Sequence, residues 1–81
     1  MQITVNFWSY FADITGTRQR TLELPEASTV ESAVDIIYQS YPTLATARKC
    51  TLIAVGVDYA PSDQVLHPND ELSFFPPVQG G

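Results

Sequence analysis

The chain ends in Gly80-Gly81, and the terminal carboxylate of Gly81 is the group best placed to do chemistry. Two glycines remove every side chain from the end of the chain, so a narrow channel of another protein can admit it. Adenylation turns such a carboxylate into an acyl donor toward sulfur or an amine. Exchange of one oxygen for sulfur turns it into a thiocarboxylate, a soft nucleophile that delivers sulfur. A terminal Gly-Gly also arises by chance or as a frayed end, so its setting has to carry the interpretation.

The residues before the glycines give the chain end a stiff exit. Pro76 and Pro77 stop the preceding strand because neither residue has a backbone N–H, and they favour an extended segment. Six residues at about 3.3 Å each reach roughly 20 Å, whereas a body of this size has a radius of gyration of only about 12 Å. The pattern therefore predicts a domain over residues 1–75 and an extended tail over 76–81 that places Gly81 clear of the domain.

The other residues that could do chemistry stand alone. Cys50 could relay sulfur as a persulfide, but the only basic residues close to it in the sequence are Arg48 and Lys49, which favours a buried structural thiol. His67 has no second ligand at metal-binding spacing, so we expect no metal site. The remaining acidic candidates lie in turn-like sequence without calcium-loop spacing: Asp58, Asp63 and Asp70.

Composition restricts the class of protein. The chain has 81 residues, enough for one small domain, and its 44% apolar content is too high for a disordered tail. A net charge of -5 argues against binding to nucleic acid or an anionic membrane. One cysteine cannot form an internal disulfide, and no stretch is typical of a membrane span or a signal peptide. We therefore expect a soluble cytoplasmic protein.

Two strands and a helix are predicted in the first half of the chain. Apolar and polar residues alternate over residues 2–7 and 18–24, which predicts an antiparallel pair of strands with Gly16 in the connecting turn. Ser28 and Glu31 then fit a capping box that opens a helix. The apolar face of this helix is expected to comprise Val30, Ala33, Val34, Ile37 and Tyr41. Pro42 should end the helix near residues 39–40.

The second half predicts further strands with loops between them. Residues 43–49 are compatible with a loop or one further helical turn. Residues 51–57 form a β-branched apolar run, typical of a strand buried on both faces. Residues 59–69 predict a loop with at most one short strand near Val65, and residues 71–75 a last strand. This order favours an α+β fold, a β-grasp (ubiquitin-like) roll with a mixed sheet of four to five strands and one main helix on one face.

Residues 70–81, DELSFFPPVQGG, resemble the C-terminal signature of the small subunits of molybdopterin synthase, a family of ubiquitin-like sulfur carriers. The resemblance implies the β-grasp topology, adenylation of Gly81 by an ATP-dependent activating enzyme, and conversion to a thiocarboxylate. That thiocarboxylate would donate sulfur to the dithiolene of molybdopterin, in molybdenum cofactor biosynthesis, within a complex with a large catalytic subunit. It also implies that the chain is not catalytic alone and binds no cofactor tightly, ATP being used by the partner enzyme.

The resemblance also assigns roles in the tail and on the surface. The residues expected to thread the tail into a partner are Pro76, Pro77, Val78, Gln79 and Gly80. Phe75, Phe11 and Tyr10 are candidates for an apolar partner interface, although each would equally suit the core.

Two departures from the family pattern leave alternatives open. Ala12 stands where family members commonly carry an arginine, and Gly56 where many carry an asparagine. A carrier for another pathway, such as thiamine, tungsten cofactor or thiolated metabolite synthesis, is compatible with both. A ubiquitin-like modifier that forms isopeptide bonds with lysines is a second alternative. A non-covalent binding domain with incidental glycines is a third.

Overall fold

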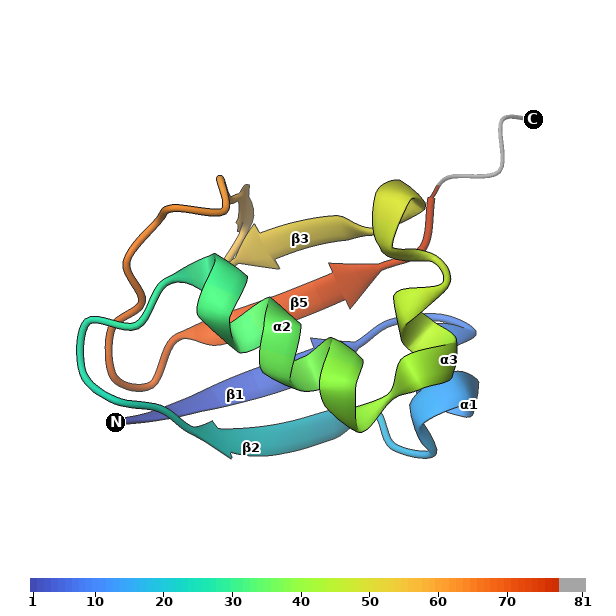
Figure 1. Ribbon diagram of the computed structural model, residues 1–81, viewed down its shortest axis with the longest axis horizontal. Coiled ribbons are helices and arrows are strands. Elements are labelled where there is room, and N and C mark those ends of the chain that lie inside the picture. Colours follow the sequence, from blue (N-terminus) through green and yellow to red (C-terminus); the bar gives the residue numbers. More distant parts are fainter. Residues whose placement is uncertain (78–81) are drawn as a thin grey trace.

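The computed structural model describes residues 1–77 and shows a two-layer fold (Figure 1). One layer is a five-stranded sheet with strand order β2-β1-β5-β3-β4. Its strands are β1 (Gln2–Phe7), β2 (Gln19–Glu23), β3 (Leu52–Val55), β4 (Asp58–Tyr59) and β5 (Glu71–Phe75). The other elements are α1 (Phe11–Thr15), α2 (Val30–Ser40), α3 (Pro42–Ala45) and the 3-10 turn η1 (Arg48–Cys50).

The sheet is mixed, as the sequence predicts. β1 pairs antiparallel with β2 and parallel with β5, and β5 pairs antiparallel with β3. The parallel pairing of β1 with β5 places the last strand in the middle of the sheet. The connection from β1 to β2 contains α1, which the sequence analysis did not predict. Gly16 ends α1 in the left-handed region, with φ 78°, a conformation that glycine adopts without strain.

Helix α2 begins one residue later than the capping box predicts. Thr29, in an extended conformation, is the N-cap, and its Oγ1 accepts a hydrogen bond from the backbone N–H of Ser32 at 3.3 Å. The Ser28 hydroxyl instead donates to the carbonyl of Pro25 at 2.6 Å, so it is not available to the helix. The helix ends at Ser40, as expected from Pro42.

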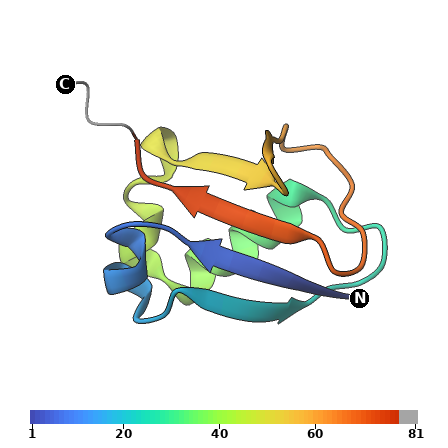
Figure 2. The same cartoon turned by 180° about the vertical axis from the view of Figure 1, so that it is seen from behind.

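The core lies between α2 and the sheet. β1 and β5 direct alternate side chains toward the helix, and ring contacts join the two layers, including Tyr38 to Phe74 at 5.8 Å between centroids. The fully buried large side chains are Ile3, Val5, Phe11, Val30, Ile37, Leu44, Leu66, Leu72 and Phe74. The opposite face of the sheet has no helix over it, as Figure 2 shows from behind.

The prediction that residues 51–57 form a strand buried on both faces is wrong. β3 covers only Leu52–Val55, Ala54 is its one buried residue, and Leu52 is 37% exposed. An apolar run has the same sequence pattern whether or not a second layer covers it, and here one face of the sheet lies open. Residues 43–49 contribute helical turns to α3 and η1. Val65 forms one isolated bridge, with Thr29.

Candidate functional site

The chain leaves the domain beside the ends of three other strands. Parallel strands β1 and β5 both end at this edge of the sheet, and antiparallel strands β2 and β3 begin there. A hydrogen bond from the backbone N–H of Trp8 to the carbonyl of Phe74, 3.1 Å long, joins the two parallel strands at the edge. Half-buried Pro76 and Pro77 follow β5 outside the strand. We call this the tail-exit edge.

An aromatic pair, one ring exposed and the other half-buried, lies at the tail-exit edge on the open face of the sheet. The rings of Trp8 and Phe75 are stacked, with centroids 5.5 Å apart and an interplanar angle of 11°. Trp8 is 49% exposed although it makes this contact. Leu52 pairs with Phe75 across the ladder and so lies on the same face. Trp8, Phe75 and Leu52 form a continuous apolar surface, which we call the aromatic strip.

The three residues predicted for a partner interface separate in the structure. Phe75 belongs to the aromatic strip, and Tyr10 is exposed beside α1. Phe11 is 0% exposed, so its side chain is part of the core and presents nothing to a partner. Sequence analysis did not select Trp8 or Leu52. A signal existed for Trp8, because it falls in the polar phase of β1, the phase that faces away from the core.

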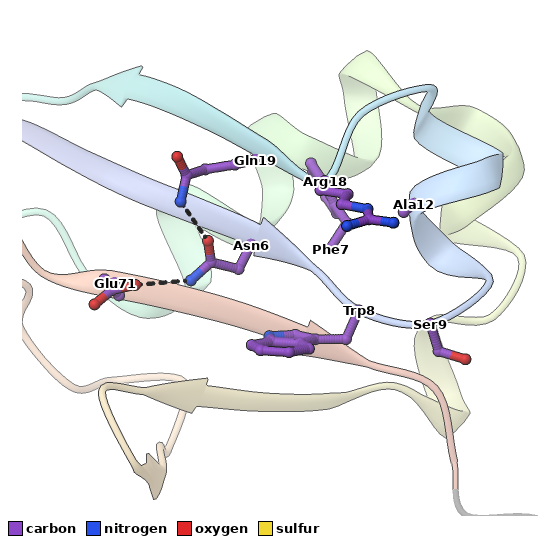
Figure 3. A pocket seen from close by; sticks show the side chains of 8 residues that line it. All are labelled: Asn6, Phe7, Trp8, Ser9, Ala12, Arg18, Gln19 and Glu71. Atoms are coloured by element: carbon purple, nitrogen blue, oxygen red, sulfur yellow. Dashed lines mark hydrogen bonds between the residues drawn. The ribbon is translucent and has the colours of Figure 1, made fainter.

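A row of polar side chains crosses the open face next to the strip (Figure 3). Gln19 Nε2 donates to Asn6 Oδ1 at 3.0 Å, and Asn6 Nδ2 donates to Glu71 Oε1 at 3.0 Å. The row joins β2, β1 and β5 and fixes the position of the Glu71 carboxylate. It also gives the open face a polar part and an apolar part, as a surface used for recognition requires.

Two open hollows flank Trp8 on this face. One, of about 490 Å³, is lined by residues of β1, β2 and α1 together with Glu71: Asn6, Phe7, Trp8, Ser9, Ala12, Arg18, Gln19 and Glu71 (Figure 3). The other, of about 450 Å³, lies over β3, β4 and β5 and is lined by Asn6, Trp8, Ala54, Gly56, Val57, Tyr59, Glu71, Ser73 and Phe75. The tail therefore leaves beside a surface that is hollowed, aromatic and uncovered.

Comparison with known proteins supplies the family. A family model described as the ThiS family matches residues 5–81, nearly the whole chain. The chain belongs to the ThiS family. Among its relatives, the molybdopterin synthase sulfur carrier subunit of Homo sapiens is 34% identical over 83 residues, covering 99% of this chain and 94% of the human protein. The corresponding subunit of Arabidopsis thaliana is 28% identical over 81 residues, covering 100% of this chain and 84% of that protein.

Solved structures confirm the fold of this ThiS family member. The crystal structure of SAMP1 from Haloferax volcanii superposes with a TM-score of 0.88 over the whole of both chains, at 21% identity. The predicted ubiquitin-like β-grasp fold is therefore confirmed, as is the resemblance to the small subunits of molybdopterin synthase.

The two departures from the family pattern have definite places in the structure. Ala12 lines the same hollow as Arg18, the residue just before β2, so this hollow contains a cation although position 12 lacks the arginine. Gly56 forms the turn between β3 and β4 with φ 62°. Asparagine is among the few other residues that adopt this conformation readily, so the departure at Gly56 preserves the turn.

The reactive end of this ThiS family member lies outside the described residues. Gly81 and Gly80, as well as the threading residues Gln79 and Val78, belong to the last four positions of the chain. Their predicted roles therefore stay predictions, and what the structure contributes is the exit at Pro77 and the surface around it.

The remaining candidates of the sequence analysis contribute no second centre. The prediction that Cys50 is a buried thiol is wrong, because Cys50 is exposed on η1. The Asp70 carboxylate accepts a hydrogen bond from the backbone N–H of His67 at 2.8 Å, a turn contact of the kind predicted for the aspartates. Within residues 1–77 no three potential metal ligands gather, and no helix is long and apolar enough to cross a membrane.

Tyr38 has a perturbed pKa, on the far side of the fold from the strip. Burial raises the pKa of its phenol above the ordinary value of 10.0, against the opposing effects of a hydrogen bond with Thr51 and the charge of Arg48. A phenol with a raised pKa stays neutral at physiological pH, so Tyr38 serves the packing of α2.

Proposed function

We propose that this chain is the sulfur carrier subunit of a molybdopterin synthase and that the C-terminal Gly81 carries the sulfur. The observation that carries the proposal is the tail exit. A central strand ends at Phe75 beside the aromatic strip, two prolines follow it, and the sequence ends in Gly80-Gly81. Membership of the ThiS family and the names of the human and Arabidopsis relatives support the same function.

The chemistry begins by activating the terminal carboxylate. A carboxylate oxygen of Gly81 attacks the α-phosphorus of ATP on an adenylating partner enzyme, and pyrophosphate leaves. A sulfur donor at the oxidation level of hydrosulfide then attacks the acyl carbon, and AMP leaves with the former carboxylate oxygen. The product is a thiocarboxylate at Gly81, whose sulfur would attack a carbon of the pterin substrate within the large subunit and displace an oxygen substituent from that carbon. Hydrolysis of the resulting thioester returns the carboxylate for another cycle.

The domain would bind the partner proteins and bring Gly81 to them, and catalysis would take place in the complex. The aromatic strip supplies apolar area next to the exit, and Pro76 and Pro77 end β5 because neither can donate a backbone hydrogen bond. Any partner that draws in Gly81 must cover the tail-exit edge. The adenylating enzyme and the large subunit would therefore bind this edge one at a time.

Intact mass measurement tests the sulfur-carrying step. The protein is incubated with ATP, the adenylating enzyme and the sulfur source of the same organism, and a species should appear that is heavier by the difference between sulfur and oxygen. The matched control lacks Gly81. Its mass should not change on incubation, and its unfolding temperature should equal that of the full chain. Absence of the heavier species from the full chain would contradict the proposal. A lower unfolding temperature for the control would point to a structural role of the tail.

A ubiquitin-like modifier is the second candidate function, favoured by the structural likeness to SAMP1, the small archaeal modifier protein 1 of Haloferax volcanii. In that role the activated Gly81 would acylate lysines of other proteins, with AMP as the leaving group. Immunoblots of cell lysate separate the two functions. A modifier gives a set of conjugates that disappears when Gly81 is deleted, whereas a carrier gives none beyond its own enzymes.

A further inference from the structure

Arg18 differs from the other two arginines of the chain. The Arg20 guanidinium lies 5.8 Å from the ring centroid of Tyr41, on the helix side of the sheet. Arg48 pairs with Asp35 at 3.1 Å. Arg18 is exposed and has no ion pair or aromatic contact within residues 1–77. It is therefore a cation available for an interaction with another molecule.

The backbone fixes Arg18 at the tail-exit edge. Its carbonyl accepts a hydrogen bond from the N–H of Phe7 at 2.8 Å, which holds the start of β2 against the end of β1. The side chain extends toward Ala12 over the end of β1, and together with Trp8 it lines the hollow of about 490 Å³ (Figure 3). Arg18, Trp8, Phe75 and Leu52 thus follow one another along the edge, from β2 to β3.

We propose that this hollow receives a carboxylate side chain of the protein that takes the tail, in a paired contact with the Arg18 guanidinium. The inference rests on the proposed function, because it assumes a partner that covers the tail-exit edge. Contact with the aromatic strip alone would leave the carrier free to rotate about its tail. A charged contact at one end of the strip fixes the orientation.

A carboxylate suits the hollow better than a phosphate. One guanidinium offers a planar pair of N–H donors, which matches one carboxylate. A phosphate dianion would need further cations, and the Glu71 carboxylate in the same hollow, held in place by Asn6, opposes a dianion more strongly than a singly charged carboxylate. The chain as a whole carries a net charge of -5, so a partner face of generally positive charge suits it. An acidic side chain of the partner opposite Arg18 would be a single negative charge on that positive face. It would fix how the two surfaces align.

Two arginines close together in the sequence, one just before β2 and one within it, provide a matched test. Arg18→Gln and Arg20→Gln each remove one positive charge, but only Arg18 lies at the tail-exit edge. Affinity for the large subunit of the same organism is measured by titration calorimetry at low and physiological salt. We expect Arg18→Gln to weaken binding roughly 10-fold or more, and Arg20→Gln by less than about 3-fold. Arg18→Lys keeps the charge but lacks the planar pair of N–H donors, so its affinity should lie between those of the wild type and Arg18→Gln.

The outcomes separate this inference from the proposed function. Thermal unfolding should be the same for the wild type and Arg18→Gln, because the side chain is exposed. If the wild type binds the large subunit but Arg18→Gln weakens binding no more than Arg20→Gln does, the inference is overturned and the proposed function stands. If the wild type does not bind, the proposed function fails first. If inorganic phosphate alone shifts the Trp8 indole resonance of the wild type but not of Arg18→Gln, the hollow is a small-anion site and the proposal is wrong.

Discussion

Trp8 directly follows β1, at a position where the alternating sequence pattern calls for a polar side chain. It follows Gln2, Thr4 and Asn6 in the phase that faces away from the core, and 49% of its surface is exposed. Stacking on Phe75 holds the indole flat against the open face. An aromatic ring held in this way loses little conformational freedom when a partner covers it, which is why such residues often dominate binding energy.

Replacement of Trp8 by alanine tests its role. We expect Trp8→Ala to weaken binding to the large subunit by about 10-fold to 100-fold, the loss typical of a central aromatic contact. Val65→Ala is the matched control, because Val65 is 44% exposed but lies in the loop before β5, away from the strip. Titration calorimetry measures both variants. Equal affinities for the two would show that the aromatic strip is not the docking surface.

The raised pKa of Tyr38 predicts how stability depends on alkaline pH. The unfolded phenol loses its proton near the ordinary pKa of 10.0, whereas the folded phenol keeps its proton to a higher pH. The stabilisation is therefore complete below pH 10 and is lost as the pH rises from there through the folded pKa. Denaturant titrations between neutral and strongly alkaline pH should show this loss in the wild type and not in Tyr38→Phe. If the free energy of unfolding falls equally with pH in the two proteins, the loss of stability does not come from Tyr38.

At the scale of the elements, the start of α2 distinguishes two candidate capping residues. Ser28 has the better sequence pattern, but Thr29 makes the capping bond to Ser32. We expect Thr29→Ala to lower the free energy of unfolding by about 1 kcal/mol, the usual effect of removing a cap. Ser28→Ala removes an exposed hydrogen bond to the carbonyl of Pro25 and should lower the free energy of unfolding by a smaller amount. Chemical denaturation measures both, and the reverse order would support the capping box predicted from the sequence.

Elements that bury one face could be predicted because their patterns are local. The alternation in β1 and in β2, and the helical spacing of α2, each reflect one face in contact with the core. Strand β5, which precedes the two prolines, could be predicted equally well from its local sequence. Short elements such as α1 and α3 have no such periodicity, since four or five residues hold too few apolar positions to define a face.

The errors concern what covers an element. Leu52 and Cys50 are apolar or readily buried residue types, yet both are exposed: Leu52 lies on the open face of the sheet, and Cys50 lies on the surface turn η1. Phe11 and Tyr10 are adjacent aromatic residues with opposite environments, one in the core and one on the surface. Burial of this kind depends on contacts distant in sequence, and composition alone does not determine it.

At the scale of the whole molecule, the parallel pairing of β1 with β5 creates the site. It brings Trp8 beside Phe75, although 67 positions separate them in the sequence, and it sets the tail exit between them and the start of β3. The chemistry proposed for Gly81 rests on the terminal segment of the sequence, whereas the surface around the tail exit depends on topology. In the proposed function, the fold would supply the exit and the docking edge, and the partners would supply the catalytic groups.

The central claim is that sulfur carried at Gly81 becomes the dithiolene sulfur of molybdopterin. The most direct measurement uses carrier loaded with isotopically heavy sulfur, mixed with the large subunit and the cyclic pterin precursor, followed by mass spectrometry of the pterin product. The account predicts that heavy sulfur leaves the carrier and appears in the pterin, and that carrier lacking Gly81 transfers none. Loaded carrier that keeps its sulfur in the presence of an active large subunit, or passes it to a different acceptor, would contradict the claim.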